Sequence, residues 1–393
     1  MQREVVIVSG VRTAIGSFGG SLKDFAPTDL AARVTREALK RAGVGGEEVG
    51  QVVFGNVIHT EAKDMYLSRV AAVDAGIGHA TPALTLNRLC GSGLQAIVSA
   101  AQSVLLGDCD IAVAGGAEVM SRAPHATGAL RWGTRMGDVG FTDMMTGALT
   151  DPFHQVHMGI TAENVAEKFG VTRVQQDALA AESHRRAAQA TAAGHFREQI
   201  LPIAIKSRKG EVVFDTDEHT RADTTADSLA TMRAAFKKDG SVTAGNASGI
   251  NDGAAALVLM DRAVAEQRGV RPLARLVSYA LAGVDPQYMG IGPVPASRKA
   301  LERAGLTIAD IDVVEANEAF AAQACAVARE LGLDPAKVNP NGSGIGLGHP
   351  IGATGAIISV KALYELQRSG GRYALVTMCI GGGQGIAAIF ERL

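Results

Sequence analysis

The sequence is poor in cysteine, in aromatic residues and in net charge, and each shortage excludes a class of protein. Four cysteines in 393 residues do not form a disulfide framework, so we expect free thiols in a reducing compartment. A net charge of −2 gives no sign of a nucleic-acid or general membrane partner. Aromatic residues make up 4% of the chain and 47 residues are glycine, which favours tightly packed α/β layers over a β-sandwich.

Long hydrophobic segments and targeting signals are also scarce. We identify no charge-free apolar stretch approaching 18 residues, so we expect no segment that spans a bilayer. The chain enters the apolar run Val5–Val8 almost at once, without a hydrophobic signal region or a transit peptide. With 47% hydrophobic residues and balanced charge, the sequence predicts a cytoplasmic globular protein of two or three domains.

The most conspicuous feature present is a glycine run from Asn341 to Gly355, in which His349 is the only side chain able to exchange protons near neutral pH. Glycine at this density lets the backbone approach a ligand closely, so we interpret the run as a wall of an active site. A flexible linker should be polar and Ser-rich, whereas this run continues into the apolar segment Ile357–Val360. A dinucleotide-binding loop should have a different glycine spacing and follow a clear strand.

Two cysteines lie beside glycines at the ends of predicted strands. Cys90 follows a strand predicted over 83–86, and Cys379 follows one predicted over 373–377. A turn from strand into helix offers free N–H groups and a partial positive charge, which favour a thiolate and can bind an oxyanion. Cys90 is therefore the best candidate nucleophile. The alternative interpretation is a small buried hydrophobic residue, which fits Cys109 and Cys325 well.

Two further interpretations of these cysteines are a zinc site and a protease. A structural zinc site formed by Cys90, Cys379 and His349 would lack the usual closely spaced ligand pair, since no C-x₂₋₄-C motif occurs. A Cys–His protease would have no need of a second cysteine in a matching glycine loop. We therefore predict no metal.

Strands alternate with helices through the first part of the chain. This rhythm predicts a largely parallel sheet covered by helices. The predicted strands cover residues 4–9, 51–55, 83–86 and 111–115, and the predicted helices cover 28–42, 65–75 and 91–106.

The second half of the chain repeats the first. Segment 38–43 returns as 300–305, an offset of 300 − 38 = 262 residues. The same offset keeps other conspicuous positions in register, which predicts an internal duplication whose polar loops converge at a shared cleft. The pairs are Gly93 with Gly355, Ala117 with Cys379, Asn87 with His349, and Gly55 with Asn317.

This repeat divides the chain into three parts. We predict a first half over residues 1–118, completed by about 250–270, and a second half over 271–393. Residues 119–249 break the pattern and contain a helix predicted over 172–193, opened by a capping-box motif. We expect this segment to form an inserted cap over the cleft.

Asn317 follows a strand predicted over 312–315 and precedes a helix. An Asn in this position is most often a helix cap. The alternative role is to hold a water molecule or to polarise a substrate carbonyl.

Four ordered motifs together resemble the thiolase family over essentially the whole chain. The resemblance is greatest to the bacterial biosynthetic β-ketothiolases that supply 3-ketoacyl-CoA for polyhydroxyalkanoate synthesis. Ketoacyl synthases use one cysteine with two histidines, and hydroxymethylglutaryl-CoA synthases pair the cysteine with a Glu, so the second cysteine favours the thiolases. The motifs are Asn87-x-x-Cys90-x-Ser92-Gly93, Asn317-Glu318-Ala319-Phe320, Gly348-His349-Pro350-x-Gly352-x-Thr354-Gly355 and Cys379-x-Gly381-Gly382-Gly383-x-Gly385.

The resemblance implies an α/β fold of two duplicated βαβαβαββ halves in a five-layer α-β-α-β-α arrangement, with an inserted loop domain. It also implies an acetyl-CoA C-acetyltransferase, which reversibly joins two acetyl-CoA into acetoacetyl-CoA and CoA by a ping-pong mechanism. No tightly bound cofactor is expected, coenzyme A thioesters are the substrates, and the expected assembly is a homotetramer. The alternatives are a degradative 3-ketoacyl-CoA thiolase of longer chains and a non-catalytic acyl-CoA carrier.

By the same resemblance, Cys90 carries the acyl group, His349 accepts its proton, and Cys379 removes an α-proton from the second acetyl-CoA. Asn317 holds a water molecule that stabilises the enolate together with His349, while the N–H groups of Cys90 and Gly381 bind the tetrahedral oxyanion. The residues expected to contact CoA are His157 and Met158 at its pantetheine end, Arg221 and Ser228 near its nucleotide, Ser248 as acceptor of a pantetheine amide, and Ala319 and Phe320. The alternative for each is a solvated loop residue.

Overall fold

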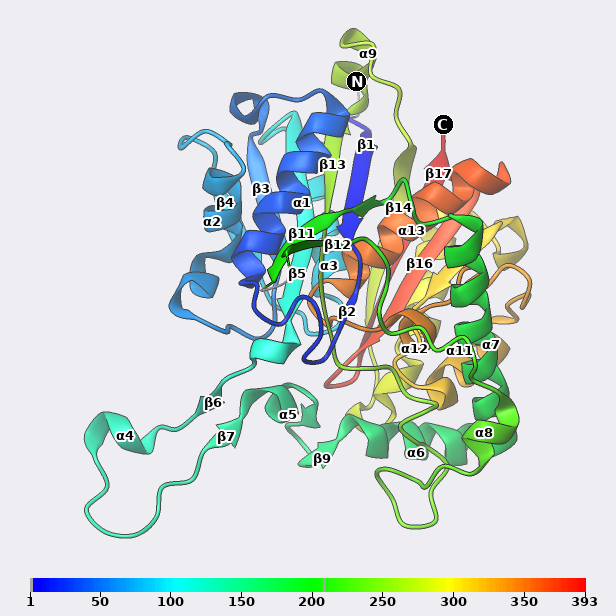
Figure 1. The fold of residues 1–393 in the computed structure, drawn as a ribbon. Helices are drawn as coiled ribbons and strands as arrows, with labels where there is room; N and C mark the ends of the chain where they lie inside the picture. The colour runs from blue at the N-terminus through cyan, green and yellow to red at the C-terminus, as the bar shows by residue number, and fades with distance from the viewer. Residues whose placement is uncertain (1–2, 208–209) are drawn as a thin grey trace.

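The strands of both halves join into one mixed sheet. The computed structural model describes residues 3–207 and 210–393, and in it the strand order is β15-β16-β17-β14-β1-β13-β5-β3-β4 (Figure 1). The halves meet where β1 pairs antiparallel with β14. The first half contributes β1 (Val5–Thr13), β3 (Gln51–Gly55), β4 (Ala83–Leu86), β5 (Ile111–Val119) and β13 (Asn251–Asp261). The second half contributes β14 (Ala274–Gly283), β15 (Val313–Ala316), β16 (Tyr373–Ile380) and β17 (Gln384–Arg392).

The prediction of a largely parallel sheet is wrong, for a topological reason. Strands β1, β3, β4 and β5 do run in one direction, as the alternation with helices requires. Strand β13, however, lies between β1 and β5 and runs antiparallel to both, and β17 lies between β14 and β16 in the same way. Each half therefore has a mixed sheet.

Helices cover both outer faces and fill the space between the halves. α1 (Pro27–Ala42) packs on β1, β5 and β13 and contacts α2 (Leu67–Asp74), whereas α10 (Pro293–Ala304) packs on β14, β16 and β17 and contacts α11 (Ala321–Leu331). α3 (Ser92–Leu106) and α13 (Thr354–Ser369) pack against each other in the centre and contact strands of both halves. Among the described strands, the two halves of the sheet are joined only through the short β1–β14 pairing and act as two β layers, which gives the five-layer α-β-α-β-α arrangement.

The duplication is visible in the ends of the elements. α1 and α10 end at Ala42 and Ala304, and each is followed by a left-handed glycine, Gly43 or Gly305, which closes the last turn. The starts of α3 and α13, and those of β5 and β16, also differ by the offset of 262 residues found in the sequence. The second half differs in one respect, because its third strand is reduced to a single bridge between Val314 and Val338.

The statement that no charge-free apolar stretch approaches 18 residues is also wrong. Leu89–Leu106 has 18 residues, no charged side chain and a mean hydropathy of 1.4, and it is the one segment of the described residues long and apolar enough to cross a membrane by length and composition. More than half of it, 56%, is buried. Its helix, α3, lies in the central layer, and a helix surrounded by protein is apolar on all sides.

The segment between the halves has two parts that differ in their contacts. α6 (Met158–Phe169) and α7 (Arg173–Ala193) pack on α11, and α8 (Ala226–Ala230) packs on α7. In contrast, the arm, defined as residues 123–143, projects away from the body and contains β6 (His125–Ala126), α4 (Ala129–Trp132) and β7 (Thr142–Asp143) (Figure 1).

The remaining short elements connect these parts. They are β2 (Gly16–Ser17), α5 (Met144–Ala148), β8 (Thr150–Asp151), β9 (Val156–His157), β10 (Ile200–Leu201), β11 (Ile203–Ser207), β12 (Gly210–Phe214), α9 (Arg262–Gln267) and α12 (Gly344–Leu347). Strand β10 pairs with β1, so part of the inserted segment extends the main sheet. The pairing of β13 with β1 and β5 supports our proposed division, in which the first half is completed after residue 249.

Candidate active site

Cys90 lies in a sharp turn between β4 and α3. The preceding residue, Leu89, has a φ of 46°, which is uncommon for a residue with a side chain. The turn is pressed against the second half, because a Cβ at Gly91 would lie 2.5 Å from a side-chain carbon of Ile380. The thiol of Cys90 remains partly exposed.

The resting state of Cys90 is a neutral thiol. Burial raises the pKa of Cys90 to about 11, although the backbone N–H groups of Gly381 and of Cys90 itself bond to the sulfur and lower the pKa. The prediction that the helix start favours the thiolate is therefore wrong, because α3 begins only at Ser92 and loss of solvation outweighs the N–H dipoles. The same two N–H groups are placed to bind an oxyanion that develops beside the sulfur.

Cys379 faces the same space from the second half. It lies inside β16, paired with Gly385, and not in the loop after a strand as predicted, because β16 continues to Ile380. Its side chain is inaccessible to solvent, and burial and the neighbouring Cys90 raise the pKa of Cys379 well above its usual range. The chain neighbours of the two cysteines, Gly91 and Ile380, are in contact, so the two halves bring the thiols near each other.

His349 is buried and held in one orientation. Its backbone N–H donates to Asn251 Oδ1 at 2.9 Å, and its Nδ1 lies 2.6 Å from Thr354 Oγ1. Since that hydroxyl donates its own hydrogen to the carbonyl of Pro350 at 2.9 Å, it accepts from Nδ1–H, which leaves Nε2 unprotonated. Burial lowers the pKa of His349 to about 4, so the imidazole is neutral at pH 7 and Nε2 can accept a proton.

Asn317 lies beside this nitrogen. Its Nδ2 is 3.4 Å from His349 Nε2, its side chain is fully buried, and its Oδ1 has no protein partner among the described residues. Asn317 is not a helix cap, because α11 begins at Ala321 and its cap position is Phe320. A buried amide oxygen without a partner fits an ordered water molecule, which is the alternative role that the sequence left open.

The residues expected at the pantetheine end of CoA lie near Cys379. Met158 lies against the turn that carries Gly381, since a Cβ at that glycine would be 3.0 Å from the Met158 methyl group. His157 stacks on Phe236 with 4.7 Å between ring centroids, and Phe236 meets Phe320 edge to face. Met158, Ala319, Phe320 and Cys379 belong to one hydrophobic cluster.

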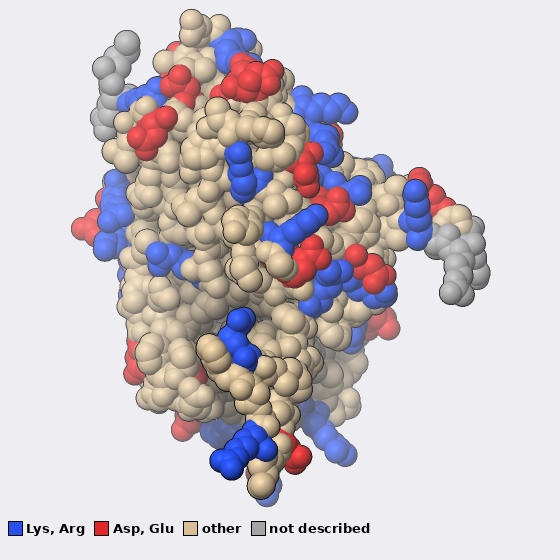
Figure 2. All heavy atoms as spheres, turned by 90° about the vertical axis from the view of Figure 1, so that its left-hand side faces the viewer, with Lys and Arg blue, Asp and Glu red and all other residues tan. Residues whose placement is uncertain are grey.

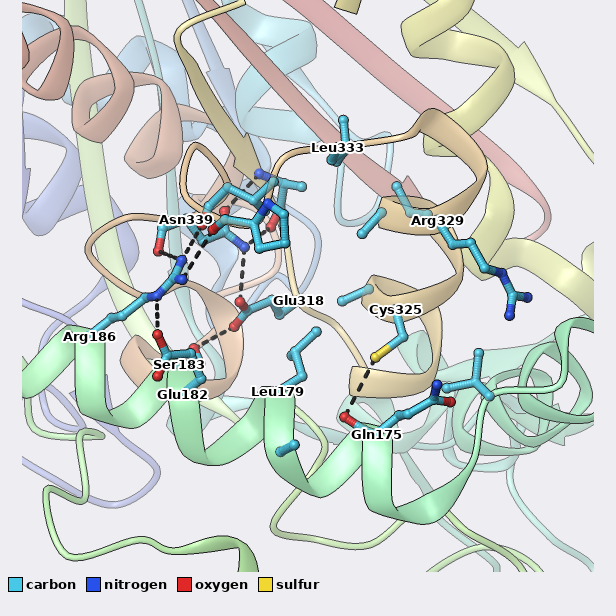
Figure 3. Close-up of a pocket in the computed structure, with 18 residues that line it drawn as sticks. Gln175, Leu179, Glu182, Ser183, Arg186, Glu318, Cys325, Arg329, Leu333 and Asn339 are labelled. Carbon is cyan, nitrogen blue, oxygen red and sulfur yellow. Dashed lines mark hydrogen bonds and ion pairs between the residues drawn. The ribbon is translucent and has the colours of Figure 1, made fainter.

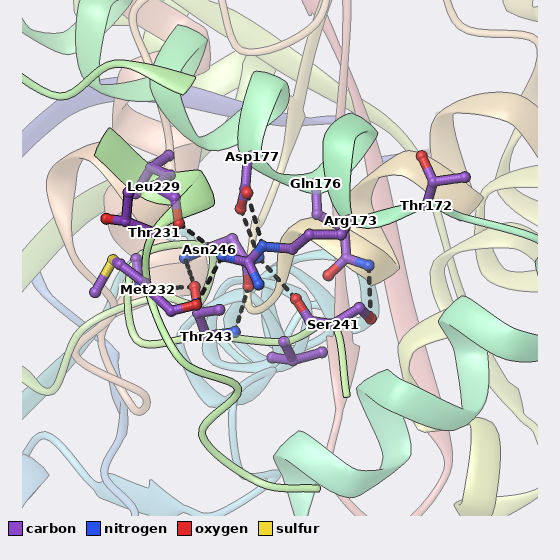
Figure 4. Close-up of polar contacts among 12 residues, drawn as sticks. Thr172, Arg173, Gln176, Asp177, Leu229, Thr231, Met232, Ser241, Thr243 and Asn246 are labelled. Atoms are coloured by element: carbon purple, nitrogen blue, oxygen red, sulfur yellow. Dashed lines mark hydrogen bonds and ion pairs between the residues drawn. The ribbon is translucent and has the colours of Figure 1, made fainter. Parts of the chain in front are cut away.

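Ser248 is carried by a loop that is fastened to this cluster. The backbone N–H of Ser248 donates to the carbonyl of Ala319 at 3.0 Å. The start of the loop is held by Asn246, whose side chain donates to Asp177 at 2.9 Å, while Arg173 donates to the same carboxylate at 2.7 Å (Figure 4). α7 therefore fixes the position of the loop.

Arg221 and Ser228 lie further out, at a polar cavity of about 270 Å³. Sequence reasoning missed two histidines in its wall, His184 and His219, whose rings stack with centroids 6.1 Å apart. Burial lowers the pKa of both rings, that of His184 to about 4. Ala247, which also lines this cavity, connects it to the loop that carries Ser248.

A larger apolar cavity of about 420 Å³ lies behind the site, between α7 and α11 (Figure 3). Cys325 lines it, whereas none of the four predicted catalytic side chains does. Its inner wall includes Glu318, which accepts from Ser183 at 2.6 Å and from Asn339 at 2.9 Å. Asn339 in this wall also bonds to both backbone groups of Ala316, and so supports the strand end next to Asn317.

The structure assigns supporting partners that sequence reasoning missed. Thr354 and Asn251 orient His349, and a buried Glu118 bonds to the glycine run at Gly352. Glu118 had a signal in the sequence, because it is the one charged residue in the apolar strand that ends the first half. Among the described residues, no group of three or more His, Cys, Asp or Glu is placed to hold a metal ion.

Comparison with known proteins gives consistent results along the whole chain. The thiolase N-terminal domain model matches residues 5–263 and the thiolase C-terminal domain model matches residues 270–392. The chain is 70% identical to the beta-ketothiolase BktB of Cupriavidus necator, with 100% of both chains covered.

Solved structures of other proteins give the same result as the sequence comparisons. The acetyl-CoA acetyltransferase of Bacillus anthracis superposes with a TM-score of 0.97 at 50% identity, covering 100% of this chain and 99% of that one. Human mitochondrial 3-ketoacyl-CoA thiolase in complex with CoA superposes with a TM-score of 0.97 at 44% identity, covering 100% and 98%. With both halves of the site, the duplicated fold and these matches in agreement, the chain belongs to the thiolase family.

Proposed function

We propose that this protein is an acetyl-CoA C-acetyltransferase, which condenses two acetyl-CoA into acetoacetyl-CoA and CoA and also catalyses the reverse thiolysis. The observation that carries the proposal is the meeting of two cysteine turns: the chain neighbours of Cys90 and Cys379, Gly91 and Ile380, touch across the two halves, and Cys90 packs against Ile351, two residues after His349. Two separate thiols suit a reaction with two separate covalent steps. The names of the relatives, beta-ketothiolase and acetyl-CoA acetyltransferase, support it.

In the first half-reaction, His349 Nε2 takes the proton of Cys90 while the sulfur attacks the thioester carbonyl of acetyl-CoA. The N–H groups of Gly381 and Cys90 bind the oxyanion of the tetrahedral intermediate, and donors of this kind contribute about 3–4 kcal/mol each. Collapse of the intermediate forms acetyl-Cys90 and expels the CoA thiolate. Because the raised pKa of Cys379 keeps it protonated at rest, Cys379 can give its proton to this leaving group.

In the second half-reaction, the Cys379 thiolate left by that step removes an α-proton from a second acetyl-CoA. His349, which still carries the proton from Cys90, and the water held by Asn317 donate hydrogen bonds to the enolate oxygen. The enolate carbon attacks the acetyl-Cys90 carbonyl, and Cys90 leaves and regains its proton from His349. Free CoA and acetoacetyl-CoA result, and both thiols return to their resting state.

We further propose how CoA lies on the surface. Its nucleotide contacts the cavity that carries Arg221 and Ser228, and its pantetheine chain follows the loop of Ser248 towards His157 and Met158. Ala319 and Phe320 pack between the loop of Ser248 and Met158, and extend the same wall. The human relative that was solved with CoA supports CoA binding.

Two variants test the proposed roles. Cys90→Ser should lose both Cys90 acetylation and turnover, whereas Cys379→Ser should still be acetylated by acetyl-CoA but should fail to form acetoacetyl-CoA. The measurement is acetoacetyl-CoA formation beside the mass of the protein. Wild-type condensation rates in Cys379→Ser would show that Cys379 is not the base that removes the α-proton.

A second candidate function is a 3-ketoacyl-CoA thiolase of longer chains. It is favoured by the match to the human 3-ketoacyl-CoA thiolase. Thiolysis rates with four-carbon and longer 3-ketoacyl-CoA substrates separate the candidates. A higher kcat/KM for the longer substrates than for acetoacetyl-CoA would favour this second candidate function.

We also propose a cytoplasmic homotetramer that supplies 3-ketoacyl-CoA, including that used for polyhydroxyalkanoate synthesis. Two surfaces support the assembly. Strand β4 ends the sheet order and exposes Leu84 beside Met65 and Tyr66. The arm exposes Trp132 and Met136 almost completely, at 89% and 91%. On the side that carries the arm, acidic and basic side chains are interspersed with broad neutral areas (Figure 2).

A further inference from the structure

Glu118 is a buried carboxylate that the mechanism above does not use. It lies near the end of β5, and its side chain has no solvent exposure. Four N–H groups donate to it, two to each oxygen, at 2.9–3.1 Å. A carboxylate can accept all four, whereas an amide of the same size offers only one oxygen.

The four donors come from both halves of the molecule. The Asn56 side chain and the backbone N–H groups of Val57 and Ile58 follow β3 in the first half. The fourth donor, the N–H of Gly352, belongs to the glycine run three residues after His349. Only glycine permits this approach, because a Cβ at Gly352 would lie 2.3 Å from the Glu118 carboxylate.

The same contacts extend to Cys90. The carbonyl of Val57 accepts from the Asn87 side chain at 3.5 Å, and Asn87 Oδ1 accepts from the N–H of Leu89 at 2.8 Å. Cys90 itself packs on the hydrophobic cluster that Ile58 forms with Met120 and Ile351. Glu118 therefore contacts the loop behind Cys90 and the loop that carries His349.

Glu118 interacts with other titratable groups through charge. Besides burial, Asp64 raises the pKa of Glu118, and Cys90 is affected by the charge of Glu118. Burial raises the pKa of Glu118 to about 8, against the effect of its N–H donors, and the Glu118 charge raises the pKa of Cys90.

We propose that Glu118 is a positioning residue for acyl transfer: it fixes the Asn56–Ile58 loop and the His349 loop relative to Cys90, and at alkaline pH, where it is ionised, it places a negative charge behind the Ile58 side of the thiol. The proposal rests on the proposed role of Cys90 as the nucleophile. Glu118 acts through the loops and through its charge, and does not contact the substrate.

The test compares Glu118→Gln and Glu118→Asp with the control Glu163→Gln. Glu163 is also a buried carboxylate that accepts backbone N–H groups, from Ser241 and Val242 at 2.8–2.9 Å, but it lies on α6 in the inserted segment. Two quantities are measured: the pH midpoint of Cys90 alkylation by iodoacetamide, followed by peptide mass, and the single-turnover rate and KM of Cys90 acetylation by acetyl-CoA.

Glu118→Gln should lower the alkylation midpoint by about 0.5–1 pH unit, because a negative charge near the thiol is lost. It should also slow acetylation about tenfold or more, with KM within about twofold of wild type, because the two loops lose hydrogen bonds. Glu118→Asp keeps the charge but has a shorter side chain. Its alkylation midpoint should equal that of the wild type, and its acetylation rate should be lower. Glu163→Gln should leave the midpoint unchanged.

A wild-type midpoint or a wild-type acetylation rate in Glu118→Gln overturns the proposal, as does the same midpoint shift in Glu163→Gln. If Glu118→Gln does not fold, the acetylation rate of Glu118→Asp tests the proposal. A rate equal to that of the wild type overturns it. The alkylation readout needs no acyl transfer. A wild-type protein that is alkylated at Cys90 but never acetylated would refute the proposed function and leave the charge effect of Glu118 measurable.

Discussion

Burial controls the ionisation of the proposed catalytic side chains. It raises the pKa of Cys90 to about 11 and lowers the pKa of His349 to about 4, so the thiol and the imidazole are both neutral at rest. Because the thiolate is the reactive form of cysteine, Cys90 is protected from stray electrophiles until a substrate carbonyl is bound near the N–H groups of Gly381 and Cys90. In the proposed mechanism, the negative charge of the Cys90 thiolate therefore forms only when the substrate carbonyl is in place to receive it.

The state of His349 depends on one hydroxyl group. Thr354→Val removes the acceptor of the Nδ1 hydrogen bond, so the imidazole loses the partner that keeps Nε2 free. An unpaired buried donor costs about 1–3 kcal/mol, which corresponds to a fall in kcat of about tenfold to hundredfold. Thr354→Ser should restore most of the activity. Steady-state thiolysis kinetics at pH 7.5 measure the effect.

The matched control is Ser359→Ala on the same helix. The Ser359 hydroxyl donates to the carbonyl of Gly355 at 2.7 Å, as Thr354 does to that of Pro350 at 2.9 Å, but it does not contact His349. Ser359→Ala should change the free energy of unfolding and leave kcat within about twofold of the wild-type value. A wild-type kcat for Thr354→Val would show that the threonine does not set the tautomer.

Residue types and spacing made Cys90, His349, Cys379 and Asn317 candidates, because glycine loops at strand ends and the repeat single them out, whereas their roles were inferred from the family resemblance. Residue types and spacing were not enough to predict the protonation state of Cys90. That state depends on how much water the folded chain excludes, and burial arises from segments far apart in the sequence.

At the scale of elements, the site depends on the close contact of α3 and α13. Both helices begin with glycine in their first turn, Gly93 in α3 and Gly355 in α13. A Cβ at Gly93 would lie 2.6 Å from the backbone N of Ala356, and one at Gly355 would lie 2.3 Å from that of Leu94. The two helix starts therefore touch through their backbones, which brings the turn of Cys90 and the loop of His349 together.

Gly355→Ala should separate the two helix starts. The added methyl group meets backbone atoms, which cannot rotate away, so we expect a loss of about 1–3 kcal/mol in the free energy of unfolding and a fall in kcat. Urea denaturation and thiolysis kinetics measure the two effects. Gly147→Ala on α5 is the control, because a Cβ there has no atom within 4 Å, and it should be neutral or slightly stabilising. Equal stability of the two variants would contradict the close contact.

The local pattern of apolar residues predicted the helices and strands in which this pattern has a clear period. It missed the elements without such a period. The helix predicted over 172–193 is α7, and the strand predicted over 51–55 is β3. The place of β13 between β1 and β5 was not predicted, because about 130 residues separate it from β5 along the chain. The two-residue strands of the inserted segment are too short to show a period.

At the scale of the whole molecule, the arm contributes little to the fold of its own chain, so we assign it to assembly. Replacing Trp132 and Met136 together by Asp should leave the protomer folded and convert the proposed tetramer to a dimer, since both side chains are exposed in the protomer and charge opposes their burial between copies. Light scattering coupled to size exclusion measures the mass. Replacing the exposed Val174 by Asp is the control, because it lies on α7 and not on the arm. An unchanged assembly in the arm variant would exclude the arm from the interface.

Cys90 carries the acyl group in the proposed mechanism, and intact mass spectrometry tests this role most directly. Wild-type protein and Cys90→Ser are incubated briefly with acetoacetyl-CoA, and any adduct is located by peptide mapping. We expect one acetyl group on Cys90 of the wild type, none on Cys90→Ser, and discharge of the group when CoA is added. A folded wild-type protein without an adduct would contradict this role of Cys90 and favour an acyl-CoA carrier.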